Sequence, residues 1–83
     1  MRILYFAWMR ERAGRAEETL ALPATVATVA ELAAWLRARD EAGAMAFANP
    51  AVIRAAVNQV FAPPDTPVAD GDEVAFFPPV TGG

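Results

Sequence analysis

Four residue types that carry much of protein chemistry are missing from this sequence of 83 residues, which has no cysteine, histidine, serine or lysine. Without cysteine and histidine, the usual protein ligands of zinc, copper and haem iron are lacking. Ser–His and Cys–His nucleophile pairs cannot be built, and a Schiff base cannot form on lysine. The lack of cysteine also excludes a disulfide framework. These absences argue against the conventional classes of catalytic or metal-binding protein.

Long apolar runs and basic clusters are absent as well. No stretch approaches the roughly 20 apolar residues of a membrane helix. The first apolar run is broken at Arg10, Glu11 and Arg12, which is unlike a signal peptide. The net charge is −3, and the seven cations are all arginines that form no basic run. We therefore expect a cytoplasmic protein that binds neither a membrane nor a nucleic acid.

The residues that are present suit one small globular domain, since 55% of them are hydrophobic. Apolar and β-prone runs predict strands over residues 2–8, 17–22, 51–57, 60–61 and 73–77. A turn at Asn58 and Gln59 joins the third and fourth of these strands, and a turn at residues 70–72 precedes the last. Asp70 and Asp72 are more typical of a solvated turn than of a metal site.

One main helix is predicted from a capping box at residues 28–31, where Thr28 and Glu31 can satisfy backbone N–H groups at the helix start. Its apolar face comprises Val29, Leu32, Ala33 and Leu36. Gly43 is the expected helix stop, followed by a loop over residues 44–50. Residues 9–14 predict a short helical turn closed by a glycine cap at Gly14.

This element order favours an α+β fold in which one main helix packs on one face of a mixed sheet, the β-grasp arrangement. Both faces of residues 2–8 are apolar, so the uncovered face meets either loops or a partner. We expect residues 1–78 to form the domain. Pro78 and Pro79 then end the last strand, because proline donates no backbone hydrogen bond.

Residues 79–83 form a predicted C-terminal tail that could reach about 15 Å from the domain. The sequence ends in Gly82 and Gly83, whose missing side chains would let such a tail enter a narrow channel in another protein. A frayed terminus or a cloning remnant would also account for this ending.

Three motifs indicate a family. They are RILYFA at residues 2–7 followed by Arg10, Glu11 and Gly14; AVNQ at residues 56–59; and DGDEVAFFPPVTGG at residues 70–83. Together they resemble the small subunits of molybdopterin synthases, which are ubiquitin-like sulfur carriers. The resemblance spans the whole chain and is most specific at its end. It implies a ubiquitin-like β-grasp fold with an extended C-terminal tail.

The resemblance also implies a chemistry at the C-terminal Gly83, with Gly82 beside it. An adenylyltransferase of the ubiquitin-activating type would use ATP to adenylate the carboxylate, which then becomes a thiocarboxylate. The large synthase subunit would pass that sulfur to cyclic pyranopterin monophosphate during molybdenum cofactor biosynthesis, within a heterotetramer. The chain would thus be the small subunit of a sulfurtransferase complex, with no bound cofactor, no metal and no catalytic side chain of its own.

By the same resemblance, the open sheet face would dock on the large subunit. The matching positions are Phe6, Phe61, Phe77, Pro78, Pro79, Val80 and Thr81. Strand alternation independently places Val74 and Phe76 toward the helix and Phe77 on the open side. Core packing is the alternative for each phenylalanine.

Three other functions stay open from the sequence. The chain could carry sulfur for thiamin or for tRNA thiolation, or it could be a protein modifier conjugated through Gly83. It could also be an interaction module with a chance Gly-Gly end.

Overall fold

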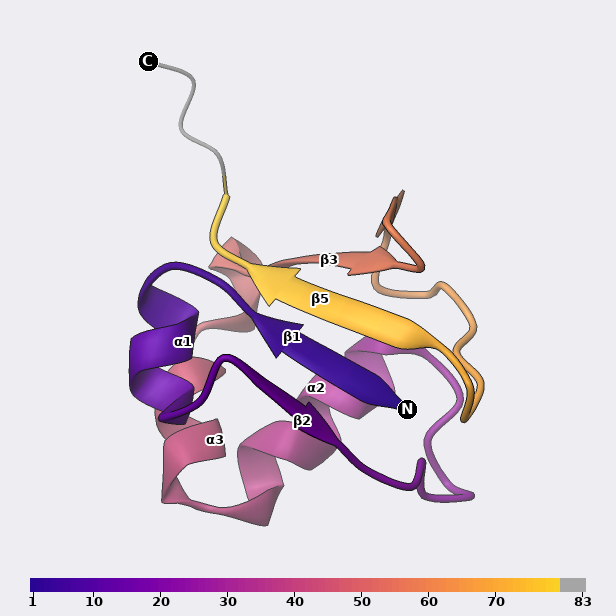
Figure 1. The fold of residues 1–83 in the computed structure, drawn as a ribbon, viewed down its shortest axis with the longest axis horizontal. Helices are drawn as coiled ribbons and strands as arrows, with labels where there is room; N and C mark the ends of the chain where they lie inside the picture. The colour runs from indigo at the N-terminus through magenta and orange to yellow at the C-terminus, as the bar shows by residue number, and fades with distance from the viewer. Residues whose placement is uncertain (80–83) are drawn as a thin grey trace.

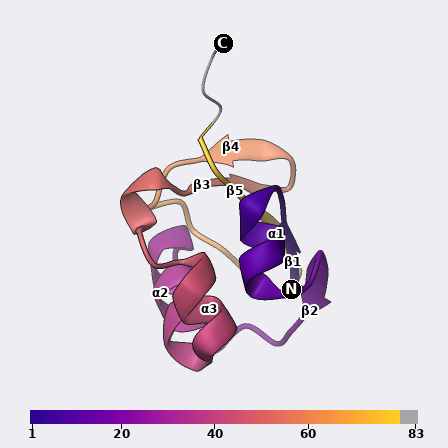
Figure 2. The same cartoon turned by 90° about the vertical axis from the view of Figure 1, so that its left-hand side faces the viewer.

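The computed structural model describes residues 1–79, so the predictions made for Val80, Thr81, Gly82 and Gly83 lie outside the described residues. The described part is a five-stranded mixed sheet with the helices α2 (Val29–Arg39) and α3 (Glu41–Ala46) on one face (Figures 1 and 2). The expected α+β class and β-grasp arrangement are confirmed. No helix in this part of the chain is long and apolar enough to cross a membrane.

The strands follow one another across the sheet in the order β2-β1-β5-β3-β4. The central pair, β1 (Arg2–Tyr5) and β5 (Glu73–Phe77), is parallel, and the neighbouring pairs are antiparallel. The remaining elements are α1 (Trp8–Ala13), β2 (Glu17–Thr19), the 3-10 helix η1 (Pro50–Val52), β3 (Arg54–Val57) and β4 (Val60–Ala62). Because β1 and β5 run the same way, the last residues of both strands lie at the same end of the sheet.

The first strand is shorter than the sequence predicts, since it ends at Tyr5 and Trp8 already begins α1. The ladder stops because of proline. Phe6 donates its N–H to the carbonyl of Phe76 at 3.1 Å, and in a parallel ladder its own carbonyl would then accept from residue 78. Pro78 has no N–H to donate. The Phe6 carbonyl accepts instead from Met9 at 3.1 Å, and this bond turns the chain into α1.

The end of α1 follows the prediction. Gly14 caps the helix with φ of 76°, in the left-handed region that glycine adopts without strain, and its N–H donates to the carbonyl of Arg10. The chain then reverses into β2, which spans only part of the expected strand over residues 17–22.

The start of α2 confirms the capping box. The Glu31 N–H donates to Thr28 Oγ1 at 3.2 Å, and Glu31 Oε1 accepts from the N–H of Ala27 at 3.1 Å. The carboxylate thus reaches one residue further back than a standard capping box requires. Of the predicted apolar face, Val29, Leu32 and Leu36 are buried.

The prediction that Gly43 ends this helix is wrong. The main helix ends at Arg39, and Asp40 opens α3 by accepting the N–H of Gly43 at 2.7 Å. Gly43 is buried where α3 crosses α2, and a Cβ on it would overlap the carbonyl oxygen of Leu36. The glycine therefore permits close contact between two helices. The expected loop over residues 44–50 is correspondingly the second half of α3 and the approach to η1, and the third strand begins only at Arg54.

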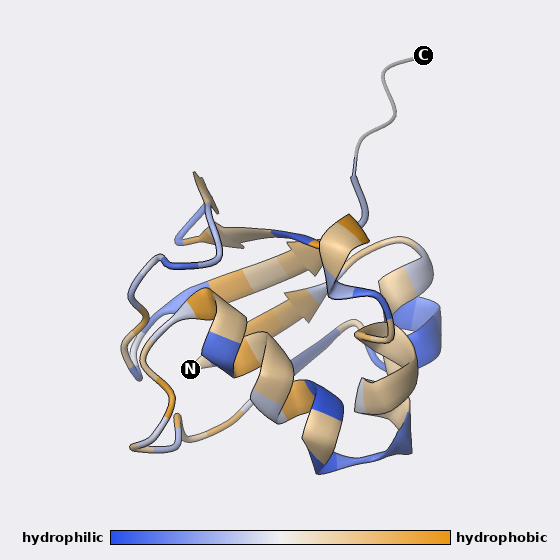
Figure 3. Cartoon of the chain, turned by 180° about the vertical axis from the view of Figure 1, so that it is seen from behind, coloured by the Kyte–Doolittle hydropathy of each residue, from blue (hydrophilic) through white to orange (hydrophobic). Residues whose placement is uncertain are grey.

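The core lies between the sheet and α2 with α3 (Figure 3). The central strands contribute Ile3, Tyr5, Val74 and Phe76, which are at most 3% exposed. Phe47, just after α3, packs edge-on against Phe76 with 4.9 Å between the ring centroids. The predicted orientation of Val74 and Phe76 toward the helices is confirmed.

Candidate partner-binding face

The chain leaves the sheet from the end of its central strand. In Figure 1, β5 lies between β1 and β3, and α2 lies behind the sheet, so the open face of the sheet is turned toward the viewer. Phe77 is the last residue of β5, and Pro78 and Pro79 follow it, both half-buried. The Phe6 N–H bonds to the Phe76 carbonyl, so Phe6 lies beside this exit point.

An apolar row crosses the open face of the sheet. Phe61 pairs with Ala56, which pairs with Ala75, which in turn pairs with Leu4. Residues directly opposite in a ladder share a face, and none of these four is buried in the core. Phe77 follows Ala75 by two residues and therefore joins the same face. The register thus gathers the predicted Phe61 and Phe77 on one apolar surface.

The exposed fractions of the predicted interface phenylalanines show whether they belong to the core. Phe6 is 49% exposed and Phe61 is 63% exposed, whereas Phe77 is half-buried. Exposed aromatic side chains that share one sheet face are typical of an interaction surface. Core packing is thereby excluded for Phe6 and Phe61. That the three contact a large synthase subunit stays a prediction.

The far end of the same face is charged. Arg2 Nε donates to Glu17 Oε2 at 2.6 Å, and Arg2 Nη1 lies 3.9 Å from Glu73 Oε1. The hydrogen bond that Arg2 donates to Glu17, followed by the charge of that carboxylate, raises the pKa of the Arg2 guanidinium. The open face is therefore polar where β1 and β5 begin and apolar where they end, next to the exit of the tail.

A tight turn holds β4 and Phe61 in place. Asn58 and Gln59 have φ of 51° and 69°, the left-handed pair that a two-residue hairpin turn requires. The Asn58 side chain accepts the Glu73 N–H at 3.0 Å and donates to Asp72 Oδ1 at 3.1 Å. That hydrogen bond, with a second from the Ala69 N–H, lowers the pKa of Asp72. The predicted hairpin turn is confirmed, and its amide ties β4 to the start of β5.

The neighbouring Asp70 also accepts a hydrogen bond from the backbone. Its carboxylate accepts the Leu22 N–H at 2.6 Å, and this bond is the main cause of its lowered pKa. The Asp72 N–H closes the turn on the carbonyl of Ala69 at 3.0 Å. The interpretation of residues 70–72 as a turn is confirmed.

The structure adds one charged residue that the sequence interpretation missed. Arg54 pairs with Phe77 in the β3–β5 ladder, so its backbone lies beside the point where the chain leaves the sheet, and its guanidinium donates to the carbonyls of Ala51 and Ile53. Alternation within the predicted strand over residues 51–57 places Arg54 and Ala56 on one face, and this signal could have found Arg54. Pro78 and Pro79 lie at the expected end of the ladder, and Val80, Thr81, Gly82 and Gly83 lie beyond the described residues.

Comparisons with known proteins agree with this geometry. The ThiS family model matches residues 3–83. The chain is 42% identical to the molybdopterin synthase sulfur carrier subunit of Escherichia coli (strain K12), over 100% of this chain and 99% of the relative. It is 35% identical to the subunit of the same name from Haemophilus influenzae, with the same coverage. The crystal structure of SAMP1 from Haloferax volcanii superposes with a TM-score of 0.71 and 29% identity, covering 100% of this chain and 98% of that chain.

Proposed function

The chain belongs to the ThiS family, and we propose that it is the sulfur-carrier subunit of a molybdopterin synthase. The full-length similarity to two subunits of that name is the observation that carries this proposal. The apolar sheet face beside the exit of the tail supports it, because a carrier must dock while its C-terminus enters a partner.

We propose that the reactive group is the α-carboxylate of Gly83. A free α-carboxylate has a pKa of roughly 3.5 and is an unreactive anion at neutral pH. Attack of this carboxylate on the α-phosphate of ATP would release pyrophosphate and leave an acyl-adenylate. A sulfur donor would then displace AMP, and the resulting thiocarboxylate would carry nucleophilic sulfur. No cysteine is needed for this sequence of steps, consistent with the composition.

The acid–base and anion-binding groups for these steps would come from the partners, an adenylyltransferase and the large synthase subunit. This chain has no histidine, cysteine or lysine to supply them. Its contribution is to present the C-terminus in a fixed direction. The parallel pair β1 and β5 is central in the sheet, with strands on both sides, and so forms a rigid base for that purpose.

Intact mass spectrometry tests the carrier chemistry on protein that ends at Gly83. Incubation with the adenylyltransferase, ATP and a sulfur source is expected to add the mass difference of one oxygen-to-sulfur exchange. Addition of the large subunit and cyclic pyranopterin monophosphate should then return the chain to its original mass while the dithiolene forms. Sulfur gain without transfer to the pterin would instead indicate a carrier for another pathway, such as thiamin synthesis or tRNA thiolation.

A protein modifier is the second candidate, favoured by the similarity to the small archaeal modifier protein 1 of Haloferax volcanii. In that case Gly83 would form isopeptide bonds with lysines of other proteins. An N-terminally tagged chain expressed in its own host should then appear in larger covalent conjugates that resist denaturant. Their absence, together with sulfur gain in the first assay, would leave the carrier function alone.

A further inference from the structure

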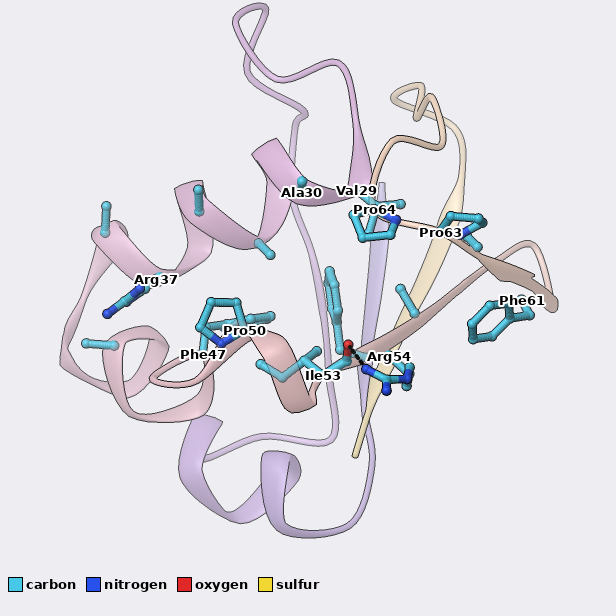
Figure 4. Close-up of a pocket in the computed structure, with 17 residues that line it drawn as sticks. Val29, Ala30, Arg37, Phe47, Pro50, Ile53, Arg54, Phe61, Pro63 and Pro64 are labelled. Atoms are coloured by element: carbon cyan, nitrogen blue, oxygen red, sulfur yellow. Dashed lines mark hydrogen bonds between the residues drawn. The ribbon is translucent and has the colours of Figure 1, made fainter. Parts of the chain in front are cut away.

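A groove opens on the helical side of the molecule and extends to the sheet edge, where Phe61 also lines it. It has a volume of about 690 Å³ and lies between α2 on one side and η1, β3 and residues 61–64 on the other (Figure 4). Buried aromatic residues, Phe47 and Phe76, line it together with Ala55, so it reaches the edge of the core. Its size is within the range of known binding clefts.

The α2 wall of the groove is built from small side chains. Four alanines of α2 line it, at positions 30, 33, 34 and 38. Lining residues extend along the helix from Val29 to Ala38, which at 1.5 Å per residue is about 14 Å. The groove is thus as long as two to three turns of a second helix, and the alanines would let that helix approach closely.

The charge of the groove is opposite to that of the whole chain. Among residues 1–79, those lining it include two arginines, Arg37 and Arg54, and no acidic side chain, although the net charge of the protein is −3. Figure 4 shows the two arginines on either side of Pro50 and Ile53. Within the described part of the chain, neither guanidinium has a carboxylate within 4.0 Å. Among residues 1–79, Arg54 donates to the backbone carbonyls of Ala51 and Ile53.

We propose that this groove is a second docking surface, which receives an acidic amphipathic helix of a partner protein. The apolar face of such a helix would cover the alanines and the core edge, and its flanking carboxylates would pair with Arg37 and Arg54. Charge complementarity selects an acidic partner, and the elongated shape of the groove selects a helix.

Addition of a strand fits this side of the molecule less well. The strand at the sheet edge is β4, which has only three residues. It runs directly into Pro63 and Pro64, which have no N–H to donate to an added strand. An occupant must therefore bind chiefly through its side chains.

The groove and the apolar sheet face meet at the β3–β4 edge of the sheet, because Phe61 belongs to the apolar row and also lines the groove. The helical wall, with Arg37 and the alanines of α2, belongs to the groove alone. The proposal rests on these residues and not on the sulfur-carrier function.

The test uses the full chain and a designed fluorescent peptide of 14 residues. The peptide is helical, with leucines at one face and glutamates flanking them, and a second peptide has lysines in place of the glutamates. Fluorescence anisotropy should show binding of the acidic peptide and not of the basic one. Arg37→Glu should weaken binding at least tenfold, whereas Arg10→Glu, the same charge change on the exposed side of α1, should leave it unchanged.

A second variant separates groove filling from charge. Ala34→Leu places a larger side chain into the groove from an exposed position of α2 and should weaken binding while circular dichroism and the melting temperature stay near wild type. The proposal is overturned if the acidic peptide does not bind the wild-type chain, or binds the Arg37→Glu and Arg10→Glu variants equally. It is equally overturned if decanoate alone shifts the groove resonances in NMR spectra, or if the chain dimerises through them.

Discussion

At the scale of single residues, the most consequential polar contact joins β2 to the end of α2. The carboxylate of Glu18 accepts two hydrogen bonds from Arg39, at 2.7 and 2.8 Å, and one from the Tyr5 hydroxyl at 2.7 Å. The Glu18 side chain is only 10% exposed. Arg39 is the main cause of the lowered pKa of Glu18, and burial, followed by the hydrogen bond to Glu18, raises the pKa of Tyr5. This cluster therefore links β2 to the last residue of β1 and to the last residue of α2.

Glu18→Gln should lower the free energy of unfolding at pH 7 by about 1–3 kcal/mol, because charged hydrogen bonds are replaced by neutral ones. The folded pKa of Glu18 lies below its ordinary value of 4.5. The stabilisation is therefore complete above that value and is lost as the pH falls through the folded pKa. Urea denaturation at pH 7 and near pH 3 measures both effects.

The control for this variant is Glu11→Gln, at an exposed position of α1 that has no ion pair within residues 1–79. Its stability should match wild type at both pH values. If the difference in unfolding free energy between wild type and Glu18→Gln were as large near pH 3 as at pH 7, the carboxylate charge would not be the source of that difference.

A strained backbone at Ala7 leads to the second residue-scale prediction. Ala7 has φ of 53° and ψ of −135°, a conformation that only glycine adopts readily. Ala7→Gly should raise the melting temperature, because relief of this strain, on the order of 1–3 kcal/mol, outweighs the extra chain entropy of glycine. Scanning calorimetry measures the change. Ala→Gly at exposed Ala34, within α2, should lower the melting temperature by contrast.

At the scale of elements, β5 performs two functions with its two faces. Val74 and Phe76 fill the core on one face, while Ala75 and Phe77 belong to the apolar row on the other. Because side chains alternate along a strand, the composition of one face can change with little effect on the packing of the other. The proposed docking function should therefore be separable from folding.

Phe77→Asp should weaken binding to the large synthase subunit by several kcal/mol, because it places an unpaired carboxylate into an apolar contact. The free chain should lose much less stability. Isothermal titration calorimetry with the large subunit measures the binding, and thermal denaturation measures the fold. Met45→Asp, at a 58% exposed position of α3 away from the sheet, is the control. Normal binding by Phe77→Asp would refute the assignment of this face.

At the scale of the whole molecule, we expect the folded core and the proposed reactive terminus at Gly83 to be separable. Within the described residues 1–79, the buried core extends from Met1 to Phe76. Pro78 and Pro79 follow the last strand, and neither is buried. Folding and reactivity should respond to different mutations.

Deletion of Gly83 should abolish sulfur transfer and leave the melting temperature unchanged. It moves the terminal carboxylate back by about 3.5 Å, a misplacement large enough to disable positioned chemistry. A residue appended after Gly83 should be equally inactive. Intact mass after incubation with the adenylyltransferase, ATP and a sulfur source provides the readout. Full activity of both variants would refute the carrier function, and unfolding on deletion would show that the terminus is structural.

Local signals in the sequence determined several parts of this protein correctly. The capping box at Thr28, the glycine cap at Gly14, the turn at Asn58 and Gln59 and the strand over residues 73–77 all formed as predicted. Each depends on residues close together in the chain, whose backbone preferences act before any tertiary contact forms. The absence of cysteine, histidine, serine and lysine likewise limited the possible chemistry from composition alone.

Tertiary structure decided the rest, because it depends on neighbours that are distant in the chain. The β1–β5 ladder ends after the Phe6 N–H because the next donor, for the Phe6 carbonyl, would be Pro78, and no local pattern reveals this. From the sequence, Gly43 is predicted to end a helix. In the structure it is needed because α3 crosses α2 there and leaves no space for a Cβ beside Leu36. The register alone brings Phe61, Ala56, Ala75 and Leu4 into one row, and the helical side forms its groove only when α2 lies opposite η1.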